Sequence, residues 1–261
     1  MSTKGHEDEN FPVASFLLPK WSRPHVLTFY DFVRGADDIA DAFELSPDQK
    51  REQLTALSVS LEAGEGALAA SLVETGVRSI HAQDLLKAFL WDVDHPRTDD
   101  WAALMAYCQL SAAPVGRYLI DLLGGIDGEY APSDALCAAL QVLNHIQDIK
   151  DDFNQLDRVY VPCDWMHAEG VALDELTAPQ SSQNLRRVLD RMLDGVDALL
   201  IEAQPMTKTI KSRSLAREAG GILAIARGLS HELRQRDPLT ERVELSKYQM
   251  LPRFVWGALW S

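Results

Sequence analysis

Helical signals dominate the pattern of apolar and polar positions along this 261-residue chain. Apolar residues recur three and four positions apart, the spacing that gives a helix one apolar face. Ser22 and Pro24 stand where an N-cap and a first-turn proline are expected. Alternating strand patterns are scarce, and residues 158–161, which a proline follows, are read as an extended loop. The pattern predicts helices over residues 25–43, 48–64, 79–93, 99–123, 133–153, 182–203, 208–235 and 245–260.

The same pattern indicates one all-α domain. Pro114 is expected to break or bend the helix around it, because proline lacks the amide hydrogen that an inner helical turn needs. No internal repeat or low-complexity linker divides the chain. We therefore expect a flexible tail over residues 1–12 and a single all-α domain over residues 13–261.

Charge narrows the classes of function. The chain carries 39 Asp and Glu residues against 25 Lys and Arg, a net charge of -14. Broad nucleic-acid binding needs a basic surface that neutralises phosphates, so this balance argues against it. An acidic protein can still bind a phosphorylated substrate when divalent cations stand between the two. Residues 205–261 have a net positive charge, unlike the chain as a whole, since they hold ten basic and five acidic residues.

The three cysteines, Cys108, Cys137 and Cys163, form no closely spaced pair. Their odd number argues against a disulfide framework or a zinc site and favours a reducing compartment. The first ten residues are polar, unlike a secretory signal, and no uninterrupted apolar run approaches about 18 residues. These features predict a cytoplasmic protein without a membrane-spanning helix.

A cluster of charged residues late in the first predicted helix is the first indication of chemistry. Asp37 and Asp41 are four positions apart, which places both carboxylates on one helical face about 6 Å apart along the axis. Arg34 lies one turn earlier on nearly the same face, and Asp38 adjoins the first carboxylate. Carboxylates embedded in an apolar helix need a partner, and a hard divalent cation is a natural one.

A second cluster repeats this spacing in an apolar stretch. Asn144, Asp148 and Asp152 follow one another at four-residue intervals, which on one helix would align three oxygen ligands. For either cluster taken alone, a network of salt bridges is the alternative interpretation. Two such helices facing each other would clamp a diphosphate through magnesium, with Arg34 contacting phosphate oxygens.

Other charged or titratable groups are interpreted as structural. Asp190 and Asp194 share the four-residue spacing, but neighbouring arginines indicate a solvated face with local ion pairs. His145 adjoins the second cluster yet points about 100° away from its neighbour, which favours a structural or supporting role over metal ligation.

Together these motifs resemble those of the squalene/phytoene synthase family of trans-type isoprenoid synthases. The resemblance covers most of the chain, from about Phe11 to Ala226. Asp37 to Asp41 resembles the first aspartate-rich motif of the family, and Asn144 to Asp152 resembles the second. Further matching segments are Ser15-Phe16, Tyr107 with Pro114-Val-Gly116, and Asp157 to Pro162.

The resemblance implies a helical bundle around a central cavity and Mg²⁺-assisted release of diphosphate from an isoprenoid diphosphate substrate. It implies catalytic metal ligation, direct or through water, by the residues Asp37, Asp41, Asn144, Asp148 and Asp152, with Asp38 in support. It implies substrate contacts by the residues Ser15, Phe16, Arg34, Gln147, Arg158 and Tyr160. Tyr107 would line the pocket and stabilise a carbocation, as would Phe16 and Phe32, with plain core packing as the alternative for each aromatic ring.

Within the family, the chain most resembles the bacterial branch that forms hydroxysqualene in hopanoid biosynthesis. Residues 9–15 resemble the start of that branch, and Gln147 stands where most phytoene and squalene synthases have arginine. The implied reaction ionises presqualene diphosphate, rearranges the carbocation and captures it with water. Condensation of two farnesyl diphosphates is one alternative, and a non-catalytic protein that binds isoprenoid diphosphates is another.

The segment from Leu245 to Trp260 combines aromatic residues with two cations. Closure of the helical bundle is the favoured interpretation of this segment. Peripheral contact with the inner face of a membrane is the alternative, and other enzymes of the pathway are candidate partners.

Overall fold

The computed structural model describes residues 17–126 and 128–259. These residues form helices and connecting loops without a β-strand, and two isolated bridges join Arg97 to Val159 and Ile126 to Ile210. The prediction of an all-α fold is therefore confirmed. The predicted tail over residues 1–12 lies outside the described residues.

The helices follow one another closely along the chain. In order they are α1 (Arg23–Asp41), α2 (Pro47–Glu62), α3 (Gly66–Thr75), α4 (Ile80–Asp94), α5 (Trp101–Ser111), α6 (Ala113–Leu122), α7 (Ala131–Gln147), α8 (Ile149–Leu156), α9 (Cys163–Glu169), the 3₁₀ helix η1 (Leu173–Thr177), α10 (Gln183–Glu202), α11 (Met206–Thr209), α12 (Arg213–Gln235) and α13 (Lys247–Leu259).

Two of the predicted helices are divided in the structure. The segment 99–123 forms α5 and α6, which separate at Ala112, and Pro114 stands in the first turn of α6 as expected of proline. The single helix predicted over 133–153 is wrong. It forms α7 and α8, which meet at Asp148, where the backbone has φ -99° and ψ 9°. The helix predicted over 208–235 begins only at Arg213, because residues 210–212 are not helical. The helices α3, α9 and α11 and the 3₁₀ helix η1 were not predicted.

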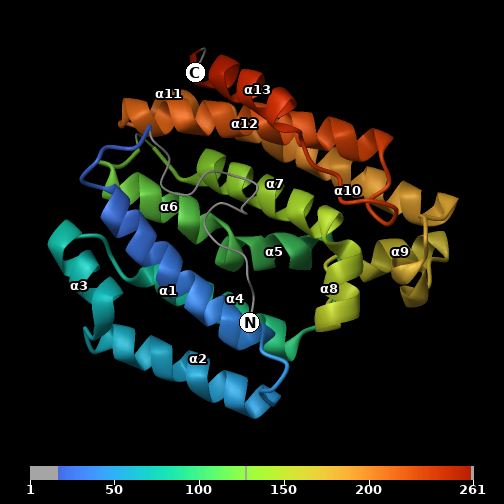
Figure 1. The fold of residues 1–261 in the computed structure, drawn as a ribbon, viewed down its shortest axis with the longest axis horizontal. Helices are drawn as coiled ribbons and strands as arrows, with labels where there is room; N and C mark the ends of the chain where they lie inside the picture. The colour runs from blue at the N-terminus through green and yellow to red at the C-terminus, as the bar shows by residue number, and fades with distance from the viewer. Residues whose placement is uncertain (1–16, 127, 260–261) are drawn as a thin grey trace.

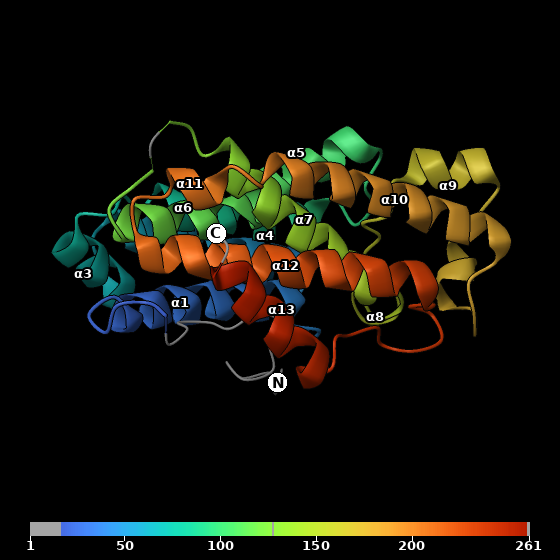
Figure 2. The ribbon, with the colours of Figure 1, turned by 90° about the horizontal axis from the view of Figure 1, so that it is seen from above.

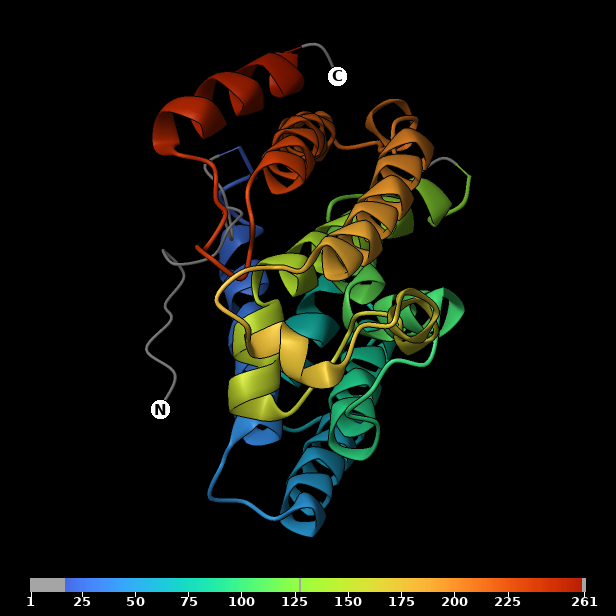
Figure 3. The same cartoon turned by 90° about the vertical axis from the view of Figure 1, so that its right-hand side faces the viewer.

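Helix α7 is the central element of the bundle (Figure 1). It packs against α5, α6, α10 and α12, and its residues Val142 and Leu143 are fully buried. Helices α1, α2 and α4 pack on one another on one side of the molecule, as Figure 3 also shows, and α13 lies outside α12 on the other.

Aromatic stacking and small residues position α1. The rings of Phe29 and Tyr118 stack with centroids 3.9 Å apart, and the Tyr118 hydroxyl donates to the carbonyl oxygen of His25. Toward its C-terminal end, Ala36 and Ala40 are fully buried against side chains of α2 and α4. The small side chains allow the helices to approach closely, so the carboxylates of α1 are held at a fixed place in the bundle.

One stretch of the described residues, Pro47–Thr75, is long and apolar enough to cross a membrane by length and composition. In the structure this stretch is divided into α2 and α3, of 16 and 10 residues, and a turn at 63–65 separates them. A spanning helix needs about 20 residues, so the stretch is only a weak candidate.

Candidate active site

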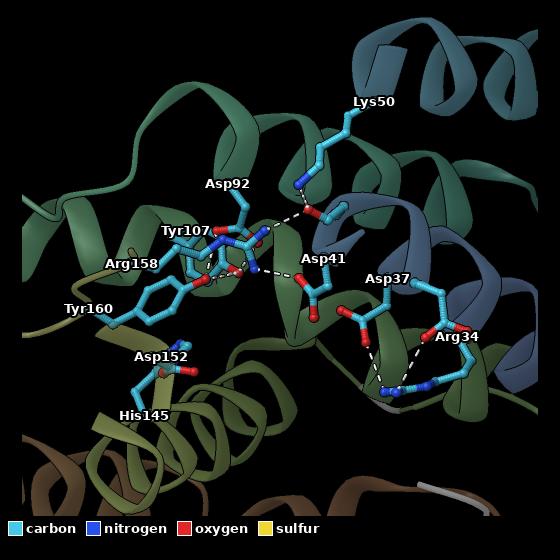
Figure 4. A network of polar contacts seen from close by, with 12 residues as sticks. Arg34, Asp37, Asp41, Lys50, Asp92, Tyr107, His145, Asp152, Arg158 and Tyr160 are labelled. Atoms are coloured by element: carbon cyan, nitrogen blue, oxygen red, sulfur yellow. Dashed lines mark hydrogen bonds and ion pairs between the residues drawn. The ribbon is translucent and has the colours of Figure 1, made fainter. Parts of the chain in front are cut away.

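The first carboxylate cluster lies at the C-terminal end of α1 (Figure 4). Arg34 donates from Nη1 to Oδ2 of Asp37 at 2.8 Å, and its Nη2 lies 3.4 Å from Oδ1 of Asp38. Asp37 and Asp41 project toward the same side of α1, whereas Asp38 is exposed. The structure thus brings Arg34, Asp37 and Asp41 together and leaves Asp38 at the edge of the cluster.

Asp37 is held in an environment that disfavours its charge. Burial raises the pKa of its carboxyl to about 7, and the negative charge of Asp41 adds to the rise. Arg34 and Arg158 oppose the shift but do not cancel it. A carboxyl of this kind gains from any further cation that reaches it.

Arg158 joins the first cluster to the rest of the site. It is buried, donates from Nη1 to Oδ1 of Asp41 at 2.7 Å and donates from Nη2 to the carbonyl oxygen of Ala40 at 3.1 Å. Lys50 donates to the same carbonyl oxygen at 2.7 Å. Two cationic side chains therefore donate to a carbonyl oxygen at the C-terminal end of α1, where the helix dipole is negative.

A buried carboxylate that the sequence did not reveal, Asp92 of α4, connects the two predicted tyrosines. The hydroxyl of Tyr107 donates to its Oδ2 and that of Tyr160 to its Oδ1, each at 2.8 Å. Burial raises the pKa of Asp92, while Arg158 and the two hydroxyls lower it. The only signal in the sequence is a lone aspartate on the buried face of an apolar helix, four positions after Ala88.

The second cluster lies where α7 passes into α8. Oδ2 of Asp152 is 3.7 Å from Nδ1 of His145, and the His145 ring stacks on Tyr160 with centroids 3.7 Å apart. His145 is buried between Tyr160 and Gln141, which agrees with a supporting role. Asn144 is half-buried on α7.

Residues near the C-terminal end also reach the second cluster. Gln147 is buried and donates from Nε2 to the carbonyl oxygen of Val243 at 2.6 Å, so this contact directs its amide toward the segment before α13. From the same segment, Arg242 donates from Nη1 to Oδ1 of Asp148 at 2.9 Å. No motif in the sequence marks Arg242, because 94 positions separate it from its partner.

The remaining predicted residues are placed as follows. Ser15 and Phe16 lie outside the described residues, and Phe32 packs against the hydrophobic core. Arg186 binds Asp190 and Arg234 binds Asp194, which confirms that these two aspartates form surface ion pairs.

The residues of both clusters fit a divalent cation by their chemistry. Among the described residues, no three His, Cys, Asp or Glu side chains already converge into a cation site. The donors nevertheless are oxygen atoms, which hard cations prefer. Four of the carboxylates pair with arginines: Asp37 and Asp38 with Arg34, Asp41 with Arg158, and Asp148 with Arg242. Burial, together with the charge of Asp41, keeps the pKa of Asp37 raised despite these arginines, so a further cation would favour its charged form.

Comparison with known proteins gives the class to which this fold and site belong. The family model for squalene/phytoene synthase matches residues 4–249, and the chain belongs to this family. A hydroxysqualene synthase of Rhodopseudomonas palustris is 40% identical over 257 residues, which cover 96% of this chain and 88% of the relative. A hydroxysqualene synthase of Zymomonas mobilis is 38% identical over 260 residues, which cover 96% of this chain and 87% of the relative.

Solved structures agree with this assignment. The crystal structure of squalene synthase HpnC from Alicyclobacillus acidocaldarius has a TM-score of 0.77 and 30% identity, and the match covers 85% of this chain and 87% of that one. A dehydrosqualene synthase solved with a ligand also has a TM-score of 0.77, at 22% identity, and supports the fold alone. The family expected from the sequence is confirmed.

Proposed function

We propose that this protein is a hydroxysqualene synthase, which converts presqualene diphosphate and water into hydroxysqualene and diphosphate. One observation carries the proposal. The chain is 38–40% identical over nearly its whole length to three proteins of that name. The substrate loses diphosphate from carbon, the resulting carbocation rearranges, water adds to it and a proton leaves.

Magnesium would be held by the oxygen ligands Asp37, Asp41, Asn144, Asp148 and Asp152, with Asp38 in support. Bound there, it would neutralise the leaving diphosphate and act as a Lewis acid. The chain's own contribution is to pair three of these half-buried ligands, Asp37, Asp41 and Asp148, with arginines. Such pairing holds the ligands in place before the substrate binds.

Arg34, Arg158 and Arg242 are proposed to bind phosphate oxygens. Each guanidinium already lies against a carboxylate of the clusters. When a cation takes over a carboxylate, the arginine beside it can donate to a phosphate oxygen instead, in the forked geometry that arginine offers. Arg242 would then supply positive charge near Gln147, where most phytoene and squalene synthases have an arginine.

Tyr107 and Tyr160 are proposed to form the wall that faces the carbocation. Both hydroxyls donate to Asp92, which fixes the orientation of the two rings. Their ring centroids lie 5.3 Å apart at an interplanar angle of 34°. An aromatic face stabilises a nearby positive charge through its quadrupole, and a wall of rings excludes bulk water from the other positions of the cation.

The product of the reaction tests this function. Purified protein is incubated with magnesium and either presqualene diphosphate or farnesyl diphosphate, and the lipid is identified by mass spectrometry. We expect hydroxysqualene from the first substrate and nothing from the second. Squalene or presqualene diphosphate formed from farnesyl diphosphate alone would establish the condensing alternative. Tight magnesium-dependent binding without turnover would establish a non-catalytic binding protein.

The proposed reaction also requires a supply of substrate. An enzyme that condenses two isoprenoid diphosphates must make presqualene diphosphate, and it is a candidate partner. A presqualene diphosphate synthase of Zymomonas mobilis is 29% identical to this chain over 184 residues, so supplier and consumer share a fold family. Because substrate and product are both lipids, we propose that the enzyme works in the cytoplasm in peripheral contact with the membrane.

A further inference from the structure

Helix α13 is docked firmly on α12 through small residues. A Cβ atom added at Gly257 would lie 2.2 Å from the carbonyl oxygen of Gly220, so the two backbones approach as closely as glycine permits. Phe254 is buried over Gly221 in the same interface. This contact supports the interpretation that the segment closes the bundle, and it also fixes which side of α13 faces outward.

The outward side of α13 is apolar as well. Its exposed residues recur three and four positions apart and therefore form one stripe along the helix. They are Tyr248, Leu251, Val255 and Leu259, with exposed fractions of 92%, 65%, 46% and 72%, and Trp256 at 63%. Figure 2 shows α13 crossing the outer surface of α12. A helix that is apolar on both faces is expected to bury both of them, and an exposed apolar patch of this kind marks an interaction site.

Charge indicates what this side of the molecule binds. The last quarter of the chain carries ten basic and five acidic residues, although the whole chain has a net charge of -14. Seven of its cations are exposed: Lys208, Lys211, Arg213, Arg217, Arg227, Arg242 and Lys247. An acidic protein approaches an anionic bilayer only through a basic region, and basic residues beside an apolar helix face are typical of helices that lie in the interface.

We propose that the exposed stripe of α13 inserts into the surface of an anionic lipid bilayer and holds the protein there. Tyr248 and Trp256 suit the headgroup level, where one part of an aromatic side chain is apolar and another is polar. The purpose of this contact, access to a lipid substrate, rests on the proposed function. The contact itself is measured without substrate, so a failure of either proposal can be recognised separately.

Vesicle binding of the full-length chain tests the proposal. Protein is floated with vesicles of phosphatidylcholine alone or of phosphatidylcholine with phosphatidylglycerol. We expect binding only to the anionic vesicles and weaker binding at high salt, because salt screens the charges. Leu251→Glu and Val255→Glu should each weaken binding about tenfold or more, since each replaces an immersed apolar side chain by a charge. Lys247→Glu should weaken binding less.

A matched control is available on a different helix, outside the stripe. Ile201 of α10 is 69% exposed, so Ile201→Glu introduces the same charge at a comparable position outside the stripe. We expect this variant to bind vesicles like the wild type. All variants change exposed side chains, and unchanged thermal unfolding will show that they fold.

Three outcomes would overturn the proposal. The first is absence of binding to anionic vesicles by the wild type. The second is binding that Leu251→Glu weakens no more than Ile201→Glu does. The third is a wild-type dimer in light scattering that becomes a monomer in Leu251→Glu while neither binds vesicles, which would assign the stripe to a second copy of the chain.

Discussion

Replacing Asp37 by asparagine should stabilise the metal-free protein while it abolishes turnover. In the native state, burial and the charge of Asp41 raise the pKa of this carboxyl from 3.8 to about 7. The unfolded chain releases the proton near the lower value and the native chain near the higher one. At pH values between these two pKa values the native state binds more protons than the unfolded chain, so the free energy of unfolding falls as the pH rises. The full destabilisation by the charged Asp37 carboxylate is present above about pH 7.

The structure sets the size of the effect. The whole interval between the two pKa values would correspond to a destabilisation of about 4 kcal/mol. The Asp37 side chain remains 30% exposed, and screening by water reduces the penalty to about 1–2 kcal/mol. Asparagine is neutral and keeps an oxygen that accepts from Arg34, so most of the penalty disappears. For a chain of this length we expect Tm to rise by about 2–5 °C.

The assay is thermal unfolding of wild type and Asp37→Asn in a chelator, from about pH 5 to about pH 8. The gain in Tm should grow with pH. Asp190→Asn is the matched control, because it removes a surface carboxylate that Arg186 binds and should leave Tm nearly unchanged at every pH. If Asp37→Asn unfolds at or below the wild-type Tm at the upper pH, the reasoning about the buried charge is wrong.

Three further changes test other parts of the site. Asp148→Asn should remove most turnover while circular dichroism shows an unchanged helix content, and near-normal turnover at limiting magnesium would contradict its place among the ligands. Asp92→Asn should leave one tyrosine hydroxyl without its acceptor and lower the free energy of unfolding by about 1–3 kcal/mol in urea titration; no loss would mean that the pairing is dispensable. Gln147→Arg should break the contact with the Val243 carbonyl and weaken water capture, with some condensing activity in the product analysis; unchanged product and rate would show that Gln147 does not decide the reaction.

The sequence was informative where contacts are local. The spacing of Arg34, Asp37 and Asp41 depends only on helical geometry, and the structure holds these residues together at the end of α1. Asp190 was assigned to the surface from its arginine neighbours, and its ion pair lies four positions away. Such contacts follow from helix geometry alone.

The sequence was silent where contacts join distant segments. Arg158 meets Asp41 across 117 positions, and Arg242 meets Asp148 across 94, so no spacing within one element could reveal either pair. Asp92 gave no motif because its two partners lie on other elements. Helix α9 has only seven residues, too few to be stable alone, and it depends on Trp165, whose ring stacks on Trp101 of α5.

The turn of the backbone at Asp148 matters to anyone who would copy this motif into a designed protein. On a straight helix, Asn144, Asp148 and Asp152 would lie along one line of about 12 Å. Here the helix direction changes at the middle residue, although no proline or glycine marks the position. A design that places these three residues on an ideal helix would reproduce their spacing in the sequence but not their arrangement in space. Such a design therefore has to include the bend as well as the ligands.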